Sequence, residues 1–272
     1  MLGASRTALA EARSKLTALG ASSADLGTLS EDLLAVVELL GHELPLRRTL
    51  ADTAVDNEAK TALVNGLFAD KVSPLTVQLL LEVVRLRWSR PGDLLQGLEA
   101  LGALASFLQA QADGTLDQVE DELFRFARIV DNEAELRLAL DDSNADAGRK
   151  RALLTGLLDG KASAPATRVI IASAVGPRRR TVAEALAEFS RLAADLRNRL
   201  NARVTAAVQP SEAQLERLGQ ELARLYGREV GLRVEVEPAL LGGMVVRVGD
   251  EVLDASVARR LDSAKRQLAE HV

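Results

Sequence analysis

Two segments of this chain share one sequence pattern, and together they predict its architecture. Residues 46–73 read LRRTLADTAVDNEAKTALVNGLFADKVS, and residues 136–163 read LRLALDDSNADAGRKRALLTGLLDGKAS. The matching residues all lie 90 positions apart without a gap: Leu46, Arg47, Leu50, Asp52, Lys60, Ala62, Leu63, Gly66, Leu67, Lys71 and Ser73 pair with Leu136, Arg137, Leu140, Asp142, Lys150, Ala152, Leu153, Gly156, Leu157, Lys161 and Ser163. Chance could supply a few Leu and Ala matches, but paired Lys, Gly and Ser at one register indicate an internal duplication.

Each copy is predicted to be a bundle of short helices. The first copy has a helix near residues 31–41, a short helix ending near Leu50, and a helix near 60–68, and the second copy repeats them 90 positions later. A polar break containing Pro then precedes an apolar helix that starts near Val77 or Thr167. We expect Leu63 and Leu153 to lie in the seams of these bundles.

A further amphipathic helix follows the second copy. Its apolar residues recur at spacings of four and three, which places them on one face: Val182, Leu186, Phe189, Ala193, Leu196 and Leu200. This face either closes its own bundle or docks a partner helix, and the first alternative is favoured.

The pattern changes to period two beyond Asn201. Apolar residues alternate with their neighbours in three runs, which predicts strands: Val204, Ala206 and Val208; Leu232, Val234 and Val236; Met244, Val246 and Val248. Ser211 and Gln214 form a predicted capping box for a helix that ends at Gly227. Gly249-Asp250 predicts a hairpin turn into a short run at Val252-Leu253, and a final helix is expected over residues 256–268.

The predicted fold class is mainly α, with tandem duplicated helical bundles followed by a small α+β C-terminal domain. The expected domains are residues 1–95 for the first copy, 96–200 for the second copy with its connecting helix, and 201–272 for the α+β domain.

Composition excludes several classes of protein. The chain has no Cys, which excludes disulfides, thiolate metal sites and a cysteine nucleophile. Its uncharged stretches are too short to span a membrane, and charged residues near the N-terminus interrupt any signal-peptide pattern. A net charge of -5 argues against a nucleic-acid binder.

One segment resembles a known family. Residues 238–250 read PALLGGMVVRVGD and are followed by Leu253, Asp254, Ala255, Ser256 and Val257, which is similar to the C-terminal signature of ATP synthase delta subunits. The mitochondrial relative in this family is the oligomycin-sensitivity-conferring protein. An ordinary delta subunit has one helical copy, and the second copy here resembles the expanded delta subunits of actinobacteria.

The resemblance implies a non-catalytic stator subunit of an F-type, proton-transporting ATP synthase. It implies two partners: the N-terminal helices of the alpha subunits, bound by the helical part, and the b-type peripheral-stalk subunits, bound by the C-terminal domain. It also implies a peripheral position at the cytoplasmic face of a bacterial plasma membrane, without cofactors or bound metal. The alternative is a helical scaffold that binds amphipathic partner helices outside energy conversion.

The motif residues are expected to have structural or interface roles: Leu241, Gly242, Gly243, Gly249, Asp250, Asp254 and Ser256. Leu241-Gly242-Gly243 precedes a strand and lacks a following Gly-Lys-Ser or Gly-Lys-Thr, so a turn is favoured over a phosphate loop. Asp250 and Asp254 have ordinary turn and helix-start roles, which are favoured over acid-base catalysis.

The remaining polar candidates have structural interpretations. His42 and His271 are the only histidines, too few for a zinc cluster, and His42 is expected to be exposed near a helix end. A basic stretch interleaves with Glu184, Glu188 and Asp195 and predicts a solvated, ion-paired face: Arg178, Arg179, Arg180, Arg191, Arg197, Arg199 and Arg203.

Overall fold

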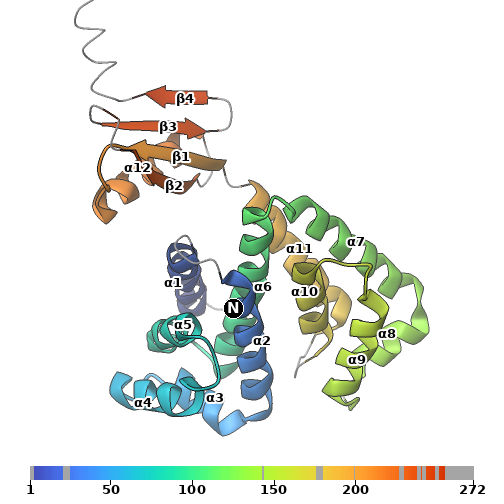
Figure 1. Ribbon diagram of the computed structural model, residues 1–272. Helices are drawn as coiled ribbons and strands as arrows, with labels where there is room; N and C mark the ends of the chain where they lie inside the picture. The colour runs from blue at the N-terminus through green and yellow to red at the C-terminus, as the bar shows by residue number, and fades with distance from the viewer. Residues whose placement is uncertain are drawn as a thin grey trace, which may run out of the picture. The chain divides into compact units, whose positions relative to one another are not determined.

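The computed structural model divides the chain into two compact units, Met1–Ala194 and Asp195–Val272. It describes residues 3–20, 25–142, 144–175, 180–198, 200–226, 230–237, 240, 243–248 and 251–254. Figure 1 shows that the first unit is built from helices and the second from a small sheet with a helix. The predicted fold class, mainly α with a small α+β C-terminal part, is confirmed.

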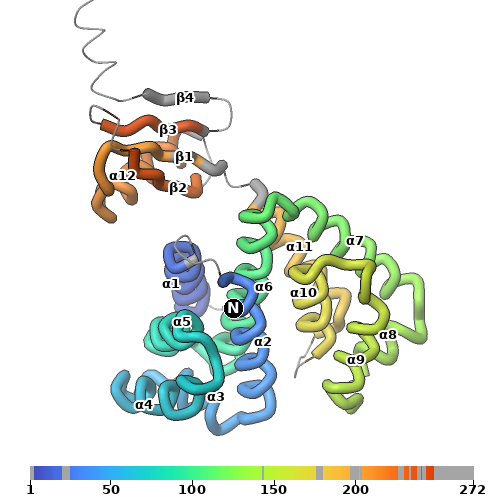
Figure 2. The backbone as a smooth tube through the Cα atoms, viewed as in Figure 1, coloured from blue at the N-terminus to red at the C-terminus, as the bar shows by residue number. Residues whose placement is uncertain are grey.

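The helical unit begins with α1 (Gly3–Gly20) and continues with ten further helices. In chain order they are α2 (Leu26–His42), α3 (Leu44–Ala51), α4 (Asn57–Phe68), α5 (Pro74–Arg85), α6 (Pro91–Ala112), α7 (Leu116–Asn132), α8 (Ala134–Asp141), α9 (Ala147–Leu158), α10 (Ala164–Ala174) and α11 (Val182–Asn198). The backbone tube in Figure 2 shows the path of the chain through them.

The helices repeat at the spacing that the sequence predicts. Helices α2 and α7, α3 and α8, and α4 and α9 have bounds that differ by 90 positions at both ends, and α5 and α10 start 90 positions apart. Ser73 and Ser163 cap α5 and α10 through their side chains, and a Pro lies in the first turn of both helices. The predicted duplication is therefore present in three dimensions.

The matched lysines also perform similar tasks. Lys60 is buried and donates from Nζ to the Val84 carbonyl oxygen at 3.1 Å, near the end of α5. Lys150 donates from Nζ to the Leu140 carbonyl oxygen at 2.6 Å, near the end of α8. Each ammonium thus satisfies a carbonyl of a helix C-terminus, where the last turn has no intrahelical donors.

Helix α6 serves both copies at once. Shifting α1 by 90 positions gives residues 93–110, which lie within α6, so this helix corresponds to α1 at the start of the second copy. It contacts α1, α2 and α3 of the first copy and α7 and α10 of the second. Residues 97–107 are all buried, as expected for a helix that is covered on every side. The expected boundary at 95/96 falls inside α6, and the three-domain division stays a prediction.

Helix α11 buries the apolar face that its periodicity predicts. Val182, Leu186, Phe189, Ala193 and Leu196 are all buried. The face is therefore packed within the chain, as the favoured alternative expected. Leu200, the sixth predicted member of the stripe, instead begins the first strand.

The C-terminal unit is a four-stranded sheet in the order β2-β1-β3-β4. Its elements are β1 (Leu200–Ala206), α12 (Glu212–Tyr226), β2 (Val230–Val236), β3 (Met244–Val248) and β4 (Glu251–Asp254). Strand β1 pairs parallel with β2 and antiparallel with β3, and β3 and β4 form an antiparallel hairpin. Ala202, Val204, Leu222 and Val246 form the buried core.

The predicted capping box is confirmed. The Ser211 amide donates to Gln214 Oε1 at 2.9 Å, and the Gln214 amide donates to Ser211 Oγ at 3.3 Å. The strand predictions need one correction, because β1 ends at Ala206 and Val208 is exposed beyond it. The final helix predicted over residues 256–268 lies outside the described residues.

One prediction about the bundle seams is wrong. Leu153 is 42% exposed, whereas its neighbour Leu154 is fully buried. Leu63 is only half-buried, whereas Val64 is in the core. Leu63 and Leu153 are identical in the two copies, but the residue that follows each of them, Val64 or Leu154, is the one that faces the interior.

Candidate partner-binding surfaces

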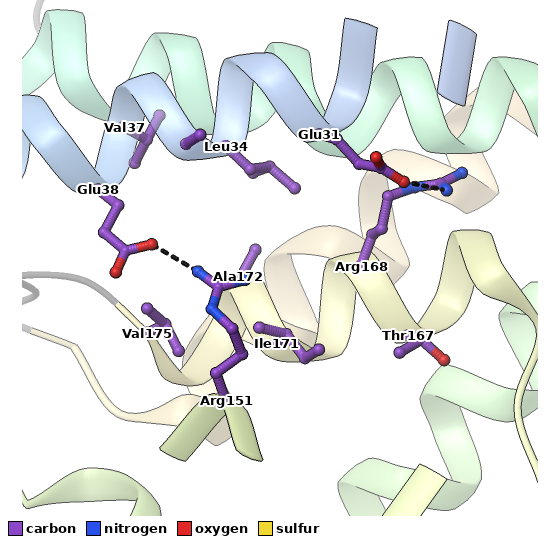
Figure 3. Close-up of a pocket in the computed structure, with 11 residues that line it drawn as sticks. Glu31, Leu34, Val37, Glu38, Arg151, Thr167, Arg168, Ile171, Ala172 and Val175 are labelled. Carbon is purple, nitrogen blue, oxygen red and sulfur yellow. Dashed lines mark hydrogen bonds and ion pairs between the residues drawn. The ribbon is translucent and has the colours of Figure 1, made fainter. Parts of the chain in front are cut away.

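A groove of about 360 Å³ lies where the two copies meet. Figure 3 shows that α2 forms one wall, with Leu34 and Val37, and that α10 forms the other, with Ile171. Arg168 of α10 and Arg151 of α9 reach across to Glu31 and Glu38 of α2, respectively. The groove is thus an apolar strip with an ion pair near each end.

Arg168 connects three helices at this junction. Its guanidinium donates to Glu31 of α2 at 3.1 Å, to Ser106 of α6 at 3.2 Å, and to Gln109 of α6. Ser30 of α2 is fully buried and lies 2.7 Å from the Ser106 hydroxyl, oxygen to oxygen. Together these bonds bind α2 and α10 to the helix that the copies share.

The position of Arg180 differs from the one predicted for the basic stretch. Arg180 was expected on a solvated face, but its side chain is only 18% exposed. It pairs with the buried Glu99 of α6 at 2.8 Å, also pairs with Glu188, and lies 5.6 Å from the centroid of the Phe189 ring. Arg180 therefore binds α6 to α11, through a partner 81 positions away.

The exposed side chain of Arg191 agrees with the expected solvated face. Arg178, Arg179 and Arg199 lie outside the described residues, and nothing is described of the side chains of Arg197 and Arg203.

Within the helical unit, the second copy exposes more large apolar side chains than the first. On α7, α8 and α9 they are Phe124, Ile129, Leu138, Leu153 and Leu157, whereas the first copy exposes Leu39 and Leu44. Such side chains are normal singly, but a concentration on one part of a surface marks a candidate interaction site. Sequence reasoning missed them, because periodicity alone does not say which helices will be left uncovered.

The C-terminal motif is described only in part. Gly243 has a backbone φ of +85°, a left-handed conformation that favours glycine, directly before β3, in agreement with a turn. Asp254 is the last residue of β4 and pairs in register with Val245. Leu241, Gly242, Gly249, Asp250 and Ser256 lie outside the described residues. The roles of all seven motif residues stay predictions.

The polar groups form no metal cluster in the part of the chain that the structure describes. His42 is the last residue of α2 and is exposed, as expected, and His271 lies outside the described residues. Burial lowers the pKa of Lys60. Its ammonium donates to the Val84 carbonyl oxygen inside the bundle, which indicates a structural role for this lysine. Among the helices described, none is long and apolar enough to cross a membrane.

Comparison with known proteins identifies the family. A sequence model of the ATP synthase delta (OSCP) subunit matches residues 103–268. The chain is 46% identical over 270 residues to "ATP synthase subunit delta" of Streptomyces coelicolor, covering 99% of this chain and 98% of the relative. It is 43% identical to the subunit of the same name from Thermobifida fusca, covering 99% and 100%, and 39% identical to that of Corynebacterium diphtheriae, covering 99% and 100%.

Among solved structures, a chain of the Toxoplasma gondii mitochondrial ATP synthase hexamer is 22% identical. The alignment covers 63% of this chain and 97% of that one, with a TM-score of 0.27, which is too low to carry an argument about the fold.

The fold and the matches together define a non-catalytic adaptor of a rotary ATP synthase. This chain belongs to the ATP synthase delta (OSCP) family. It is a stator subunit of the peripheral stalk of an F-type ATP synthase, a membrane-associated complex. The predicted resemblance to the expanded actinobacterial form is confirmed, because this chain and actinobacterial delta subunits align over nearly their whole lengths.

Proposed function

We propose that the helical unit holds the N-terminal helices of the alpha subunits at the crown of the catalytic head, and that the C-terminal unit meets the ends of the b-type stalk subunits. The chain then works as a joint that resists torque while protons drive the rotor. It acts at the cytoplasmic face of the bacterial plasma membrane, through the complex and not through a span of its own.

The packing of α2 supports this role for the helical unit. Helix α2 contacts both α6 and α10, and its apolar residues Leu29 and Leu33 are fully buried. The helical scaffold thus accommodates an amphipathic helix laid along two others, which is the mode by which helical domains bind partner helices. Several such contacts around the crown of the head would reinforce each other through avidity.

The seven motif residues belong to the proposed stalk-binding unit. Gly243 and Asp254 lie next to or within the β3-β4 hairpin at one edge of the sheet. We propose that they shape this edge and take no part in catalysis.

Co-elution in size-exclusion chromatography tests the proposal. The full chain and a chain truncated before Asn201 are each mixed with a catalytic head stripped of its own delta subunit. Both forms are expected to co-elute with the stripped head and not with a head that retains its delta subunit. Failure of the full chain to bind the stripped head would contradict the proposal.

A further inference from the structure

The two copies differ in the residues that meet at their junction. Polar side chains that hold each bundle together are the same in both copies: Lys60 and Lys150 donate to carbonyls at helix ends, and Ser73 and Ser163 cap α5 and α10. The polar residues that join α9 and α10 to α2 and α6 are Glu31, Glu38, Ser106, Gln109, Arg151 and Arg168, and their counterparts 90 positions away are Asp121, Arg128, Leu16, Leu19, Thr61 and Gln78. No pair is identical, and only Asp121 keeps the charge of its counterpart. These contacts therefore belong to the junction and not to the fold of a single copy.

The inner part of the junction is firmly bonded to α6. The Arg168 side chain is only 14% exposed and donates to Ser106 and Gln109 of this helix. Just before α11, Arg180 pairs with the buried Glu99 of the same helix. Separating a buried charge from its partners is strongly unfavourable. The second copy is thus anchored on the helix that both copies share.

The outer part of the junction depends on ion pairs that solvent reaches. Figure 3 shows Glu31 and Glu38 of α2 extending to Arg168 and Arg151, one pair near each end of the groove. The Glu31 side chain is 62% exposed, and the side chain of Arg151 is 49% exposed. Exposed ion pairs are weak and are screened by salt, since the Debye length falls to about 3 Å at 1 M. The contact of α2 with α9 and α10 is therefore easier to separate than the contact of the second copy with α6.

The apolar strip between the two ion pairs is only partly packed. Val37 of α2 and Val175 at the end of α10 line the groove and are buried. Leu34 and Ile171 line the same space of about 360 Å³ and are only half-buried. Atoms that face an unfilled space lack the dispersion contacts of a close-packed interface. The strip alone thus holds α2 and α10 together less firmly than a filled interface would.

We propose that the Glu31–Arg168 and Glu38–Arg151 pairs form an ionic latch that sets the orientation of the second copy on the first. The closed latch holds α9 and α10 against α2. When salt screens the pairs or one charge is reversed, the second copy pivots on α6 and the groove widens. This device lies within the chain itself, so it does not depend on which subunits bind the chain. In a stator, it determines how far the two copies bend apart under load.

Distances between spin labels in the full chain test the latch. Because the chain has no Cys, two introduced cysteines are the only labelling sites. Thr49→Cys on α3 and Thr155→Cys on α9 place one label at an exposed position of each copy. Thr49→Cys with Asn65→Cys places both labels on the first copy and is the control pair. Pulsed electron paramagnetic resonance gives the distance distribution at low salt and at about 1 M salt.

The parent chain should respond to salt between the copies and not within one. We expect a narrow distribution between positions 49 and 155 at low salt and a longer, broader one at about 1 M, while the control pair is unchanged. Glu38→Arg, which gives α2 the charge that Arg128 has on α7, should produce the longer, broader distribution already at low salt. Lys161→Glu, an exposed charge outside the groove, should leave the distribution as in the parent.

Exchange of the two charges separates orientation from a loss of folding. Glu38→Arg combined with Arg151→Glu restores an attractive pair and should return the narrow distribution, which a general loss of packing would not allow. A distance between the copies that is independent of salt in the parent would overturn the latch, and so would a Glu38→Arg effect that the exchanged pair does not reverse. The salt series needs no variant at the latch, so it tests the proposal even where Glu38→Arg fails to fold.

Discussion

Asp32 and Glu122 lie 90 positions apart and hold the same serine in the two copies of the repeat. Asp32 accepts the Ser73 amide at 2.8 Å, and Glu122 accepts the Ser163 amide at 2.9 Å and its hydroxyl at 2.6 Å. Each bond runs from α2 or α7 to the residue that caps α5 or α10. Helix α2 thus positions the start of α5, and α7 positions the start of α10.

Removing these carboxylates should destabilise each bundle. Asp32→Ala and Glu122→Ala are each expected to lower the free energy of unfolding by about 1–3 kcal/mol, since a part-buried amide loses a charged acceptor. Unfolding in urea measures the change. Asp70→Ala removes an exposed carboxylate from the same unit and should change it by less than about 0.5 kcal/mol. Equal losses in all three variants would contradict the account.

Arg180→Ala should be more costly than the loss of an exposed arginine. The change leaves the buried Glu99 without the guanidinium that is 2.8 Å from its carboxylate. Breaking a buried pair typically costs about 3–5 kcal/mol in the free energy of unfolding. Arg191→Ala, on the exposed side of α11, is the control and should cost less than about 0.5 kcal/mol. Similar effects for the two arginines would show that Arg180 is not a structural cross-link.

Leu154→Ala and Leu153→Ala form a matched pair on α9. Leu154 is fully buried, so its truncation should cost about 2–5 kcal/mol of unfolding free energy, whereas Leu153→Ala should cost less than about 1 kcal/mol. Thermal unfolding of the full chain would show the difference in Tm. A larger loss of stability from Leu153→Ala than from Leu154→Ala would mean that α9 turns Leu153, and not Leu154, toward the interior.

The pair of Lys15 and Glu82 predicts a small dependence of stability on acid pH. The hydrogen bond to Lys15 lowers the pKa of Glu82 below its usual value of 4.5. The unfolded chain therefore binds more protons in acid, so this contribution to stability is present above pH 4.5 and is lost as the pH falls through the lowered pKa.

Because both side chains are about one-third exposed, the contribution should not exceed about 1 kcal/mol. Glu82→Gln should lower stability at pH 7 by that amount, and the difference between variant and parent should shrink below pH 4 in urea unfolding. A constant difference across this range would contradict the assignment.

Local signals in the sequence predicted much of the fold. The repeat located four helices in each copy, and the alternation of apolar residues located three strands, because both depend on neighbours in the chain. The Ser211 and Gln214 capping box was predicted for the same reason and is confirmed.

Features that depend on distant residues were not predicted. Helix α6 gave no sign that both copies share it, since its apolar residues are spread around the helix and show no single preferred face. The partner of Arg180 lies 81 positions away, and the exposure of Phe124 depends on which copy covers which. These contacts join residues that are far apart in the sequence, so local sequence patterns do not reveal them.

Restoration of proton-driven ATP synthesis tests whether this chain joins the catalytic head to the stalk. Membranes that contain the synthase but have been stripped of its delta subunit receive either the full chain or the chain truncated before Asn201, and the rate of ATP synthesis is measured. We expect the full chain to restore synthesis and the truncated chain not to, because the truncated chain lacks the unit that is proposed to meet the stalk. Full restoration by the truncated chain, or none by a full chain that has bound the head, would contradict a stator that joins the head to the stalk.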